Sequence, residues 1–215
     1  MTPRTVEDRL REEYVLLSPE LKRVLHQLRT DVTYLLLPVT LSLEHHERIQ
    51  IEARVKECDS AMDSLCRRKE GRVFDEKSPS KYSLTHLPDL VGVRVLVFPR
   101  SLLDRVHTIV RSRYEDWTSD PVESGIPTRV LARKYHGFCA TSSKIRAEIQ
   151  IMSMLTGLFW RVEHAAFYKP RDAELKGSAK KPLLGNRVNR VYAAFDAFES
   201  MLELELESDG GRTSI

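Results

Sequence analysis

The sequence predicts an α+β domain built around a single mixed β-sheet flanked by helices. Several segments alternate apolar and polar residues as strands do, and the segments between them carry apolar residues at helical spacing. Because both kinds of segment are interleaved along 215 residues, we expect them to share one core. The strand-like segments are 48–56, 90–98, 135–141 and 144–152, and the main helix-like segments are 58–68, 102–110, 153–168 and 187–207.

Residues 1–44 are expected to form a separate helical segment made of two helices. Thr5 begins the first helix, with Asp8 three residues later as in a capping box. Ser18-Pro19 marks a second start, because proline is favoured at the first position of a helix. Pro38 is expected to stop this helix, since an internal proline removes a hydrogen bond and clashes with the preceding turn.

The middle of the chain is expected to form the core domain, residues 45–170. Residues 70–87 and 118–127 contain Gly or Pro among many polar residues, which predicts loops. Strands 135–141 and 144–152 are separated only by Ser142-Ser143, which predicts a hairpin.

Residues 171–215 are expected to form a basic loop followed by a helix. The loop is rich in Lys, Gly and Pro, and the helix at 187–207 carries an apolar face. Three roles are open to that face. Packing on its own domain is the default expectation, and the others are formation of a homo-oligomer and binding of an antitoxin-like protein.

Composition narrows the class of protein. With 41% apolar and 30% charged residues the chain can build a core, and a net charge of +3 gives no strong global case for nucleic acid, although basic residues cluster locally. No apolar stretch approaches the ~18–20 residues that cross a bilayer, and the N-terminus lacks the apolar core of a secretory signal. We expect the three cysteines to be free thiols, as they are in proteins of a reducing compartment. We therefore expect a cytoplasmic protein with no membrane partner.

Two acidic residues interrupt apolar runs that otherwise read as strands. Asp89 begins the segment Asp89-Leu-Val-Gly-Val-Arg94, and Glu148 begins Glu148-Ile-Gln150. Ionised groups are rarely placed in buried strands unless they are paired or bind a metal. Two acids on neighbouring strands are suited to share one Mg²⁺, which fills its remaining positions with phosphate oxygens. The pattern predicts chemistry on a phosphate chain; a cap before a strand is the structural alternative for Asp89.

An ordered set of motifs resembles the RelA/SpoT nucleotide pyrophosphokinase domain, and in particular its small single-domain members, the small alarmone synthetases. Each motif alone is weak, but the ordered set is specific and covers roughly residues 45–170. The resemblance implies a nucleotidyltransferase-like fold, Mg²⁺ as cofactor, and transfer of the β,γ-pyrophosphate of ATP onto a ribose 3′-hydroxyl. The matching residues are Arg54-Val-Lys56, Ser60, Asp89 to Arg94, Tyr135, Glu148-Ile-Gln150, Trp160, Glu163-His164 and Tyr168-Lys169.

The resemblance assigns roles around the donor. Arg54 and Lys56 match the pair that grips the ATP phosphates, and two cations on one strand can neutralise a polyphosphate. Asp89 matches the magnesium carboxylate, and Glu148 the acid that assists the metal or takes the proton of the attacking hydroxyl. Arg94 is expected to support its neighbours, on the opposite strand face from Asp89 if the strand is regular.

Other matches concern the acceptor. Tyr135 matches a tyrosine that stacks on the acceptor base, although a buried core tyrosine is the structural alternative. Gln150 and His164 are expected nearby, with Glu163 and Lys169 in supporting positions.

The chain departs from the family near both substrates. A lysine usually stands four residues after the serine that matches Ser60, but Ser64 occupies that place. Arg67 or Lys69 is then expected to substitute for it in binding ATP. Family members usually read Tyr-x-Ser-x-His where this chain has 135–139, and Ile-Arg-Thr where it has 151–153, so a phosphate-facing arginine is missing.

These departures leave the acceptor open between a guanosine nucleotide (GDP or GTP), an adenosine nucleotide and the 3′ end of tRNA. Segment 154–170 resembles the toxic small alarmone synthetases, some of which modify tRNA and block translation. A tRNA backbone could bind basic surface patches instead of a polyphosphate pocket. No His-Asp dipeptide of the family's hydrolase domain occurs, so we expect synthesis only. The alternative function is a catalytically inactive RelA/SpoT-like binding or regulatory module.

Overall fold

The computed structural model describes residues 5–68, 73–123, 130–163 and 181–210, and its centre is a five-stranded sheet. The strand order is β1-β2-β5-β4-β3, in which β2 and β5 run parallel while the other neighbours are antiparallel. The predicted α+β class with one mixed sheet is confirmed. The strands are β1 (Arg48–Val55), β2 (Val91–Phe98), β3 (Thr118–Glu123), β4 (Val130–Phe138) and β5 (Arg146–Ser153).

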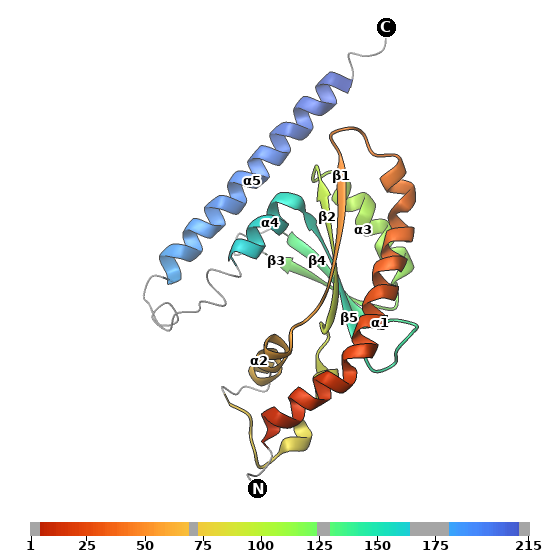
Figure 1. The fold of residues 1–215 in the computed structure, drawn as a ribbon. Coiled ribbons are helices and arrows are strands. Elements are labelled where there is room, and N and C mark those ends of the chain that lie inside the picture. Colours follow the sequence, from red (N-terminus) through yellow and green to blue (C-terminus); the bar gives the residue numbers. More distant parts are fainter. Residues whose placement is uncertain (1–4, 69–72, 124–129, 164–180, 211–215) are drawn as a thin grey trace.

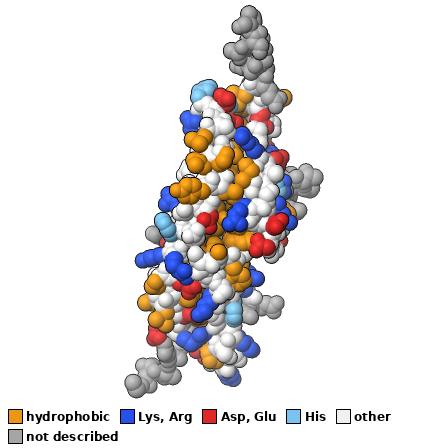
Figure 2. Space-filling model, turned by 90° about the vertical axis from the view of Figure 1, so that its right-hand side faces the viewer, with side chains coloured by type: hydrophobic (Ala, Val, Ile, Leu, Met, Phe, Trp, Pro, Cys, Tyr) orange, Lys and Arg blue, Asp and Glu red, His pale blue; other side chains and the backbone are white. Residues whose placement is uncertain are grey.

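Helices α1 (Val6–Leu41) and α3 (Leu102–Arg113) cover one face of the sheet (Figure 1). This face carries the apolar members of the central strands, which pack with the buried side of α1 into the main core. From this side the surface shows apolar side chains interspersed with both signs of charge (Figure 2).

The prediction of two N-terminal helices was wrong, because α1 is continuous through Pro19 and Pro38. Each proline deprives the carbonyl four residues earlier of its helical donor. Those carbonyls belong to Val15 and Tyr34, whose residues are 69% and 71% exposed, so water can take the place of the missing donors. The predicted capping box between Thr5 and Asp8 is present.

The helices that the structure describes cover only part of the second face of the sheet, which we call the open face. Helix α4 (Met154–Glu163) packs on β2 and β5, and α5 (Lys181–Gly210) packs on α4 (Figure 1). Helix α2 (Cys58–Arg68) follows β1 and packs against α1. The described part of the expected loop at 70–87 contains two short 3₁₀ turns, Pro79–Lys81 and Leu84–His86.

The expected loop at 118–127 was wrong in its first half, which forms the edge strand β3 with Pro121 inside it. An edge strand tolerates proline because one side of its backbone has no partner strand. The expected hairpin is confirmed by the antiparallel pairing of β4 with β5, with a longer connection than Ser142-Ser143. Among the described residues, no helix is both long enough and apolar enough to cross a membrane.

Candidate active site

The open face of the sheet carries aligned rows of polar side chains. Strand pairing places residues of four strands side by side, and partners in register point to the same face. We call the first row the site row, formed by Arg54, Gly92, Glu148 and His136, and the second the support row, formed by Glu52, Arg94, Gln150 and Lys134. The third row is apolar, with Leu96, Met152 and Ala132, and lies against Met154 and Trp160 of α4. Helix α4 therefore closes one end of this face.

Glu148 is a buried carboxylate at the centre of the site row. It is 6% exposed, and its Oε2 lies 3.6 Å from Lys134 Nζ and 3.5 Å from His136 Nε2. Its Oε1 accepts a hydrogen bond from Gln150 Nε2. These contacts give both oxygens of Glu148 a polar partner in a site that solvent barely reaches.

A chain of hydrogen bonds that runs from Arg94 through Gln150 orients Glu148. Arg94 Nε donates to Gln150 Oε1 at 3.2 Å, which leaves the Gln150 amide to donate to Glu148. Burial lowers the pKa of Arg94, and the neighbouring charge of Arg54 lowers it further. Since β2 begins only at Val91, strand alternation does not extend to Asp89 and does not test the expected opposite placement of Arg94. The supporting role of Arg94 stays a prediction.

The second acid, Asp89, lies just before β2 and contacts Lys56. Lys56 Nζ and Asp89 Oδ2 are 2.5 Å apart, and the backbone N–H of Lys56 donates to Leu90 O at 2.8 Å. Asp89 Oδ1 is buried and has no hydrogen-bond partner among the described residues. An unpaired buried carboxylate oxygen is costly unless something else binds it.

These residues fit the expected Mg²⁺, although they do not form a closed cage. Asp89 lies in a turn two residues before β2, and Gly92, three residues after it, is the register partner of Glu148. Within the described chain no group of three or more His, Cys, Asp or Glu side chains could hold a metal. Mg²⁺ commonly takes one or two carboxylates and completes its shell with water and phosphate. The free oxygen of Asp89 suits that arrangement.

Tyr135 requires a correction. It is fully buried on the opposite face of the sheet, in the main core, and its hydroxyl contacts His107 Nδ1 of α3. Burial raises the pKa of this hydroxyl. A ring enclosed on that face is not accessible to a base bound beside Glu148, so the structure argues against the expected stacking role and favours the core tyrosine.

His136 and Lys134 are the site residues that the acceptor motif did not reveal. In a motif of the form Tyr-x-Ser-x-His the three named residues share one strand face. On β4 the face that carries Glu148's partners has Ala132, Lys134 and His136, so the histidine position fits His136. The tyrosine position then falls on Ala132, which is 2% exposed and packs in the row beneath α4.

The remaining predicted residues lie around this face or outside the described chain. Ser60 is half-buried on α2, and Arg67 is exposed near the end of that helix, where it donates to Ser64 Oγ at 3.3 Å. Glu163 is the last residue of α4. Lys69, His164 and Lys169 lie outside the described residues.

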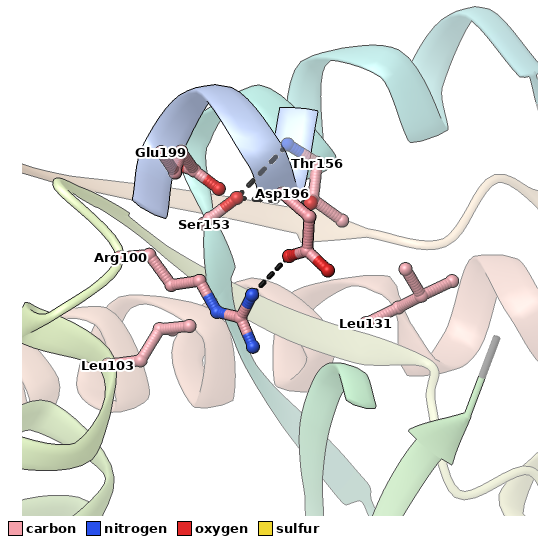
Figure 3. Close-up of a pocket in the computed structure, with 7 residues that line it drawn as sticks. All are labelled: Arg100, Leu103, Leu131, Ser153, Thr156, Asp196 and Glu199. Carbon is pink, nitrogen blue, oxygen red and sulfur yellow. Dashed lines mark hydrogen bonds and ion pairs between the residues drawn. The ribbon is translucent and has the colours of Figure 1, made fainter. Parts of the chain in front are cut away.

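A separate polar cluster lies where α5 meets the start of α4 (Figure 3). Arg100 forms an ion pair with Asp196, and the Ser153 hydroxyl donates to Thr156 Oγ1 at 3.0 Å. Glu199 is 0% exposed, and the Ser153 hydroxyl lies near its carboxylate without a hydrogen bond of normal geometry. Burial raises the pKa of Glu199 to about 7.

The chain has the α+β fold of the RelA/SpoT synthetases, and the solved structures that it matches include small alarmone synthetases. The resemblance seen in the motifs is thus confirmed at the level of the fold. No protein-family model and no curated protein matches the sequence.

Particular solved structures show how closely the fold is shared. Small alarmone synthetase 1 from Bacillus subtilis, bound to its product pppGpp, is 16% identical, with a TM-score of 0.63 over 93% of this chain and 99% of that one. The same enzyme bound to AMPCPP gives 17% identity and a TM-score of 0.61, covering 92% and 99%. A GTP pyrophosphokinase family protein from Streptococcus pneumoniae gives 18% and 0.60, covering 92% and 94%.

Proposed function

We propose that this protein is a Mg²⁺-dependent pyrophosphokinase that moves the β,γ-pyrophosphate of ATP onto the 3′-hydroxyl of a nucleotide or of tRNA. One observation carries the proposal: the buried carboxylate of Glu148 lies beside Lys134 and His136 on the open face of the sheet. A second carboxylate, Asp89, lies just before β2, and one of its oxygens has no hydrogen-bond partner among the described residues. The shared fold with nucleotide-bound synthetases supports it.

Each side chain has a role in this proposal. Asp89 and Glu148 would hold Mg²⁺, which when bound neutralises charge on the β- and γ-phosphates. Arg54 binds the triphosphate, and Lys56 exchanges part of its contact with Asp89 for phosphate oxygens. Glu148, oriented by Gln150, accepts the proton of the attacking 3′-hydroxyl.

The acceptor binds on the β4 side, where Lys134 and His136 flank Glu148. The pppGpp-bound relative favours a guanosine nucleotide. The absence of a tyrosine on this face of β4 and the apolar Met152 in place of an arginine favour an acceptor that is held by contacts elsewhere, as the 3′ end of tRNA would be.

The test is a transfer assay with γ-labelled ATP, Mg²⁺ and GDP, GTP or deacylated tRNA. Asp89→Asn and Glu148→Gln are each expected to lower the transfer rate at least a hundredfold, since each removes a charge at the reacting phosphates. Asp104→Asn is the matched control, because that carboxylate is 88% exposed on the opposite helix layer. Transfer that survives both site substitutions contradicts the proposal. Binding of ATP without transfer to any acceptor would instead indicate the inactive binding module.

A further inference from the structure

An ion pair crosses the open face between α4 and the edge of the sheet. Arg161 of α4 contacts Glu52 Oε1 of β1, and their side chains are 46% and 26% exposed. An exposed pair of this kind stabilises the fold little, because water and salt screen it. The pair is therefore a weak tether, and a multivalent anion can compete with Glu52 for the guanidinium.

Arg161 belongs to a cluster of three arginines. Arg54 and Arg94 occupy the adjacent positions of β1 and β2, and Glu52 is the register partner of Arg94. Arg161 reaches this part of the sheet through its contact with Glu52, and the charges of Arg54 and Arg161 both lower the pKa of Arg94 while Glu52 and Glu148 raise it. Glu148, the other acid near Arg94, already contacts Lys134 and His136. The cluster thus has an excess of positive charge.

At the α4 end of the face, the strand that carries Glu148 supplies no cation; its Arg146 lies at the other end, over the Phe138 ring. Met152 stands where related sequences have an arginine, and it is 0% exposed beneath α4. Helix α4 instead supplies a cation, Arg161. Its side chain contacts Glu52 of β1, the strand that also carries Arg54.

We infer that Arg161 is a triphosphate-binding residue: on binding of ATP it leaves Glu52 and, together with Arg54, contacts the phosphates of the donor. A guanidinium can bind two phosphate oxygens through two parallel N–H donors. Its contact with a single oxygen of Glu52 leaves other N–H donors available. This inference rests on the proposed function, because it takes ATP as the donor.

Substituting the two partners of the ion pair should change ATP affinity in opposite ways if Arg161 binds phosphate. The comparison therefore distinguishes phosphate binding by Arg161 from a purely structural role of the ion pair. Arg161→Gln and Glu52→Gln break the same contact. If Arg161 binds phosphate, Arg161→Gln raises the Kd for AMPCPP in Mg²⁺ and the KM for ATP about tenfold, with the acceptor KM within twofold of wild type. Glu52→Gln frees Arg161 and leaves the Kd equal or lower. Arg161→Lys keeps the charge without the planar fork and is expected to fall between.

The measurements are isothermal titration calorimetry with AMPCPP and with AMP, and steady-state kinetics. AMP affinity is expected to be the same in all variants, since AMP lacks the β- and γ-phosphates. Equal weakening by Arg161→Gln and Glu52→Gln, or wild-type affinity in Arg161→Gln, overturns the inference while the proposed function stands. A wild-type protein that binds no AMPCPP and transfers nothing overturns the proposed function, and the inference with it.

Discussion

At the residue scale, Gly92 leaves open space in the middle of the site row. A Cβ added there would meet nothing closer than the Glu148 carbonyl oxygen at 3.9 Å, which is an ordinary contact. We expect Gly92→Ala to keep or slightly raise the free energy of unfolding, by up to ~1 kcal/mol, because alanine is less flexible in the unfolded chain. It should lower transfer about tenfold or more, because the methyl group occupies space between Arg54 and Glu148. Thermal unfolding and the labelled transfer assay measure both effects.

Gly137 provides the contrast for that prediction. It lies on the core face of β4, and a Cβ there would come within 2.4 Å of the Trp117 ring, whose residue is 5% exposed. Gly137→Ala should therefore cost stability, roughly 1–3 kcal/mol, and leave the activity of the folded protein nearly unchanged. Lost activity in Gly137→Ala together with full activity in Gly92→Ala would contradict the assignment of the two faces.

The sequence predicts the strand face of Glu148 and Gln150 well, but it predicts the faces of the β4 residues poorly. The reason is physical. Along β5 the alternation is clear, because Ala147, Ile149 and Ile151 mark the core face. Along β4 both sets of alternate residues mix polar and apolar side chains. Tyr135 shares its face with arginine and glycine, and His136 shares its face with alanine and lysine. Only packing against α3 decides that Tyr135 is the buried one.

At the element scale, we expect the contact between α5 and α4 to depend on the protonation of Glu199. Its pKa of about 7 in the folded protein lies above the ordinary value of 4.5, so the folded state binds the proton more tightly. The stabilisation is complete below about pH 4.5 and is lost as the pH rises towards 7. Burial is the main cause, and the charges of Asp196 and Glu203 act in the same direction while Arg100 and Ser153 oppose it.

Glu199→Gln should flatten this dependence. The neutral amide cannot ionise, so we expect the melting temperature of the variant to exceed that of the wild type at pH 8 and to approach it at pH 5. Glu205→Gln on the same helix is the matched control, because that side chain is exposed. Identical pH profiles for wild type and Glu199→Gln would show that Glu199 does not control the contact.

Elements with strong hydrophobic periodicity were predictable from the sequence. The prolines led to a wrong prediction, because α1 does not end at either of them. Strands β1 and β2 and helices α2 and α3 follow from their patterns because each has one apolar face. The rules for proline describe the average cost of a lost hydrogen bond. They do not include tertiary packing, which holds α1 together beyond Pro19 through Leu21, Val24 and Leu28.

At the scale of the whole molecule, α1 is the element on which the core depends. It runs along the sheet (Figure 1) and contributes eight buried residues to its own packed side, among them Leu28 at 0% exposure. Leu28→Ala should cost about 2–5 kcal/mol through lost burial and the cavity left behind. For a chain of this size, that lowers the melting temperature on the order of 10 °C.

Leu16→Ala is the control on the same helix, because Leu16 is 80% exposed. Its melting temperature should stay within about 2 °C of the wild type, since surface substitutions usually change stability by less than ~0.5 kcal/mol. Calorimetry of both variants checks the pair. Equal losses would mean that the outer side of α1 is covered in solution.

The proline within β3 also has a consequence for how copies of this protein meet. An uncovered outer strand offers a row of backbone donors and acceptors to any neighbouring chain, which is the usual beginning of sheet-to-sheet aggregation. Here Pro121 removes one donor, Asp120 adds a charge, and the register shifts between Val122 and Glu123. The outer margin of the sheet is thereby a poor template, so concentrated solutions should resist fibre growth from this side.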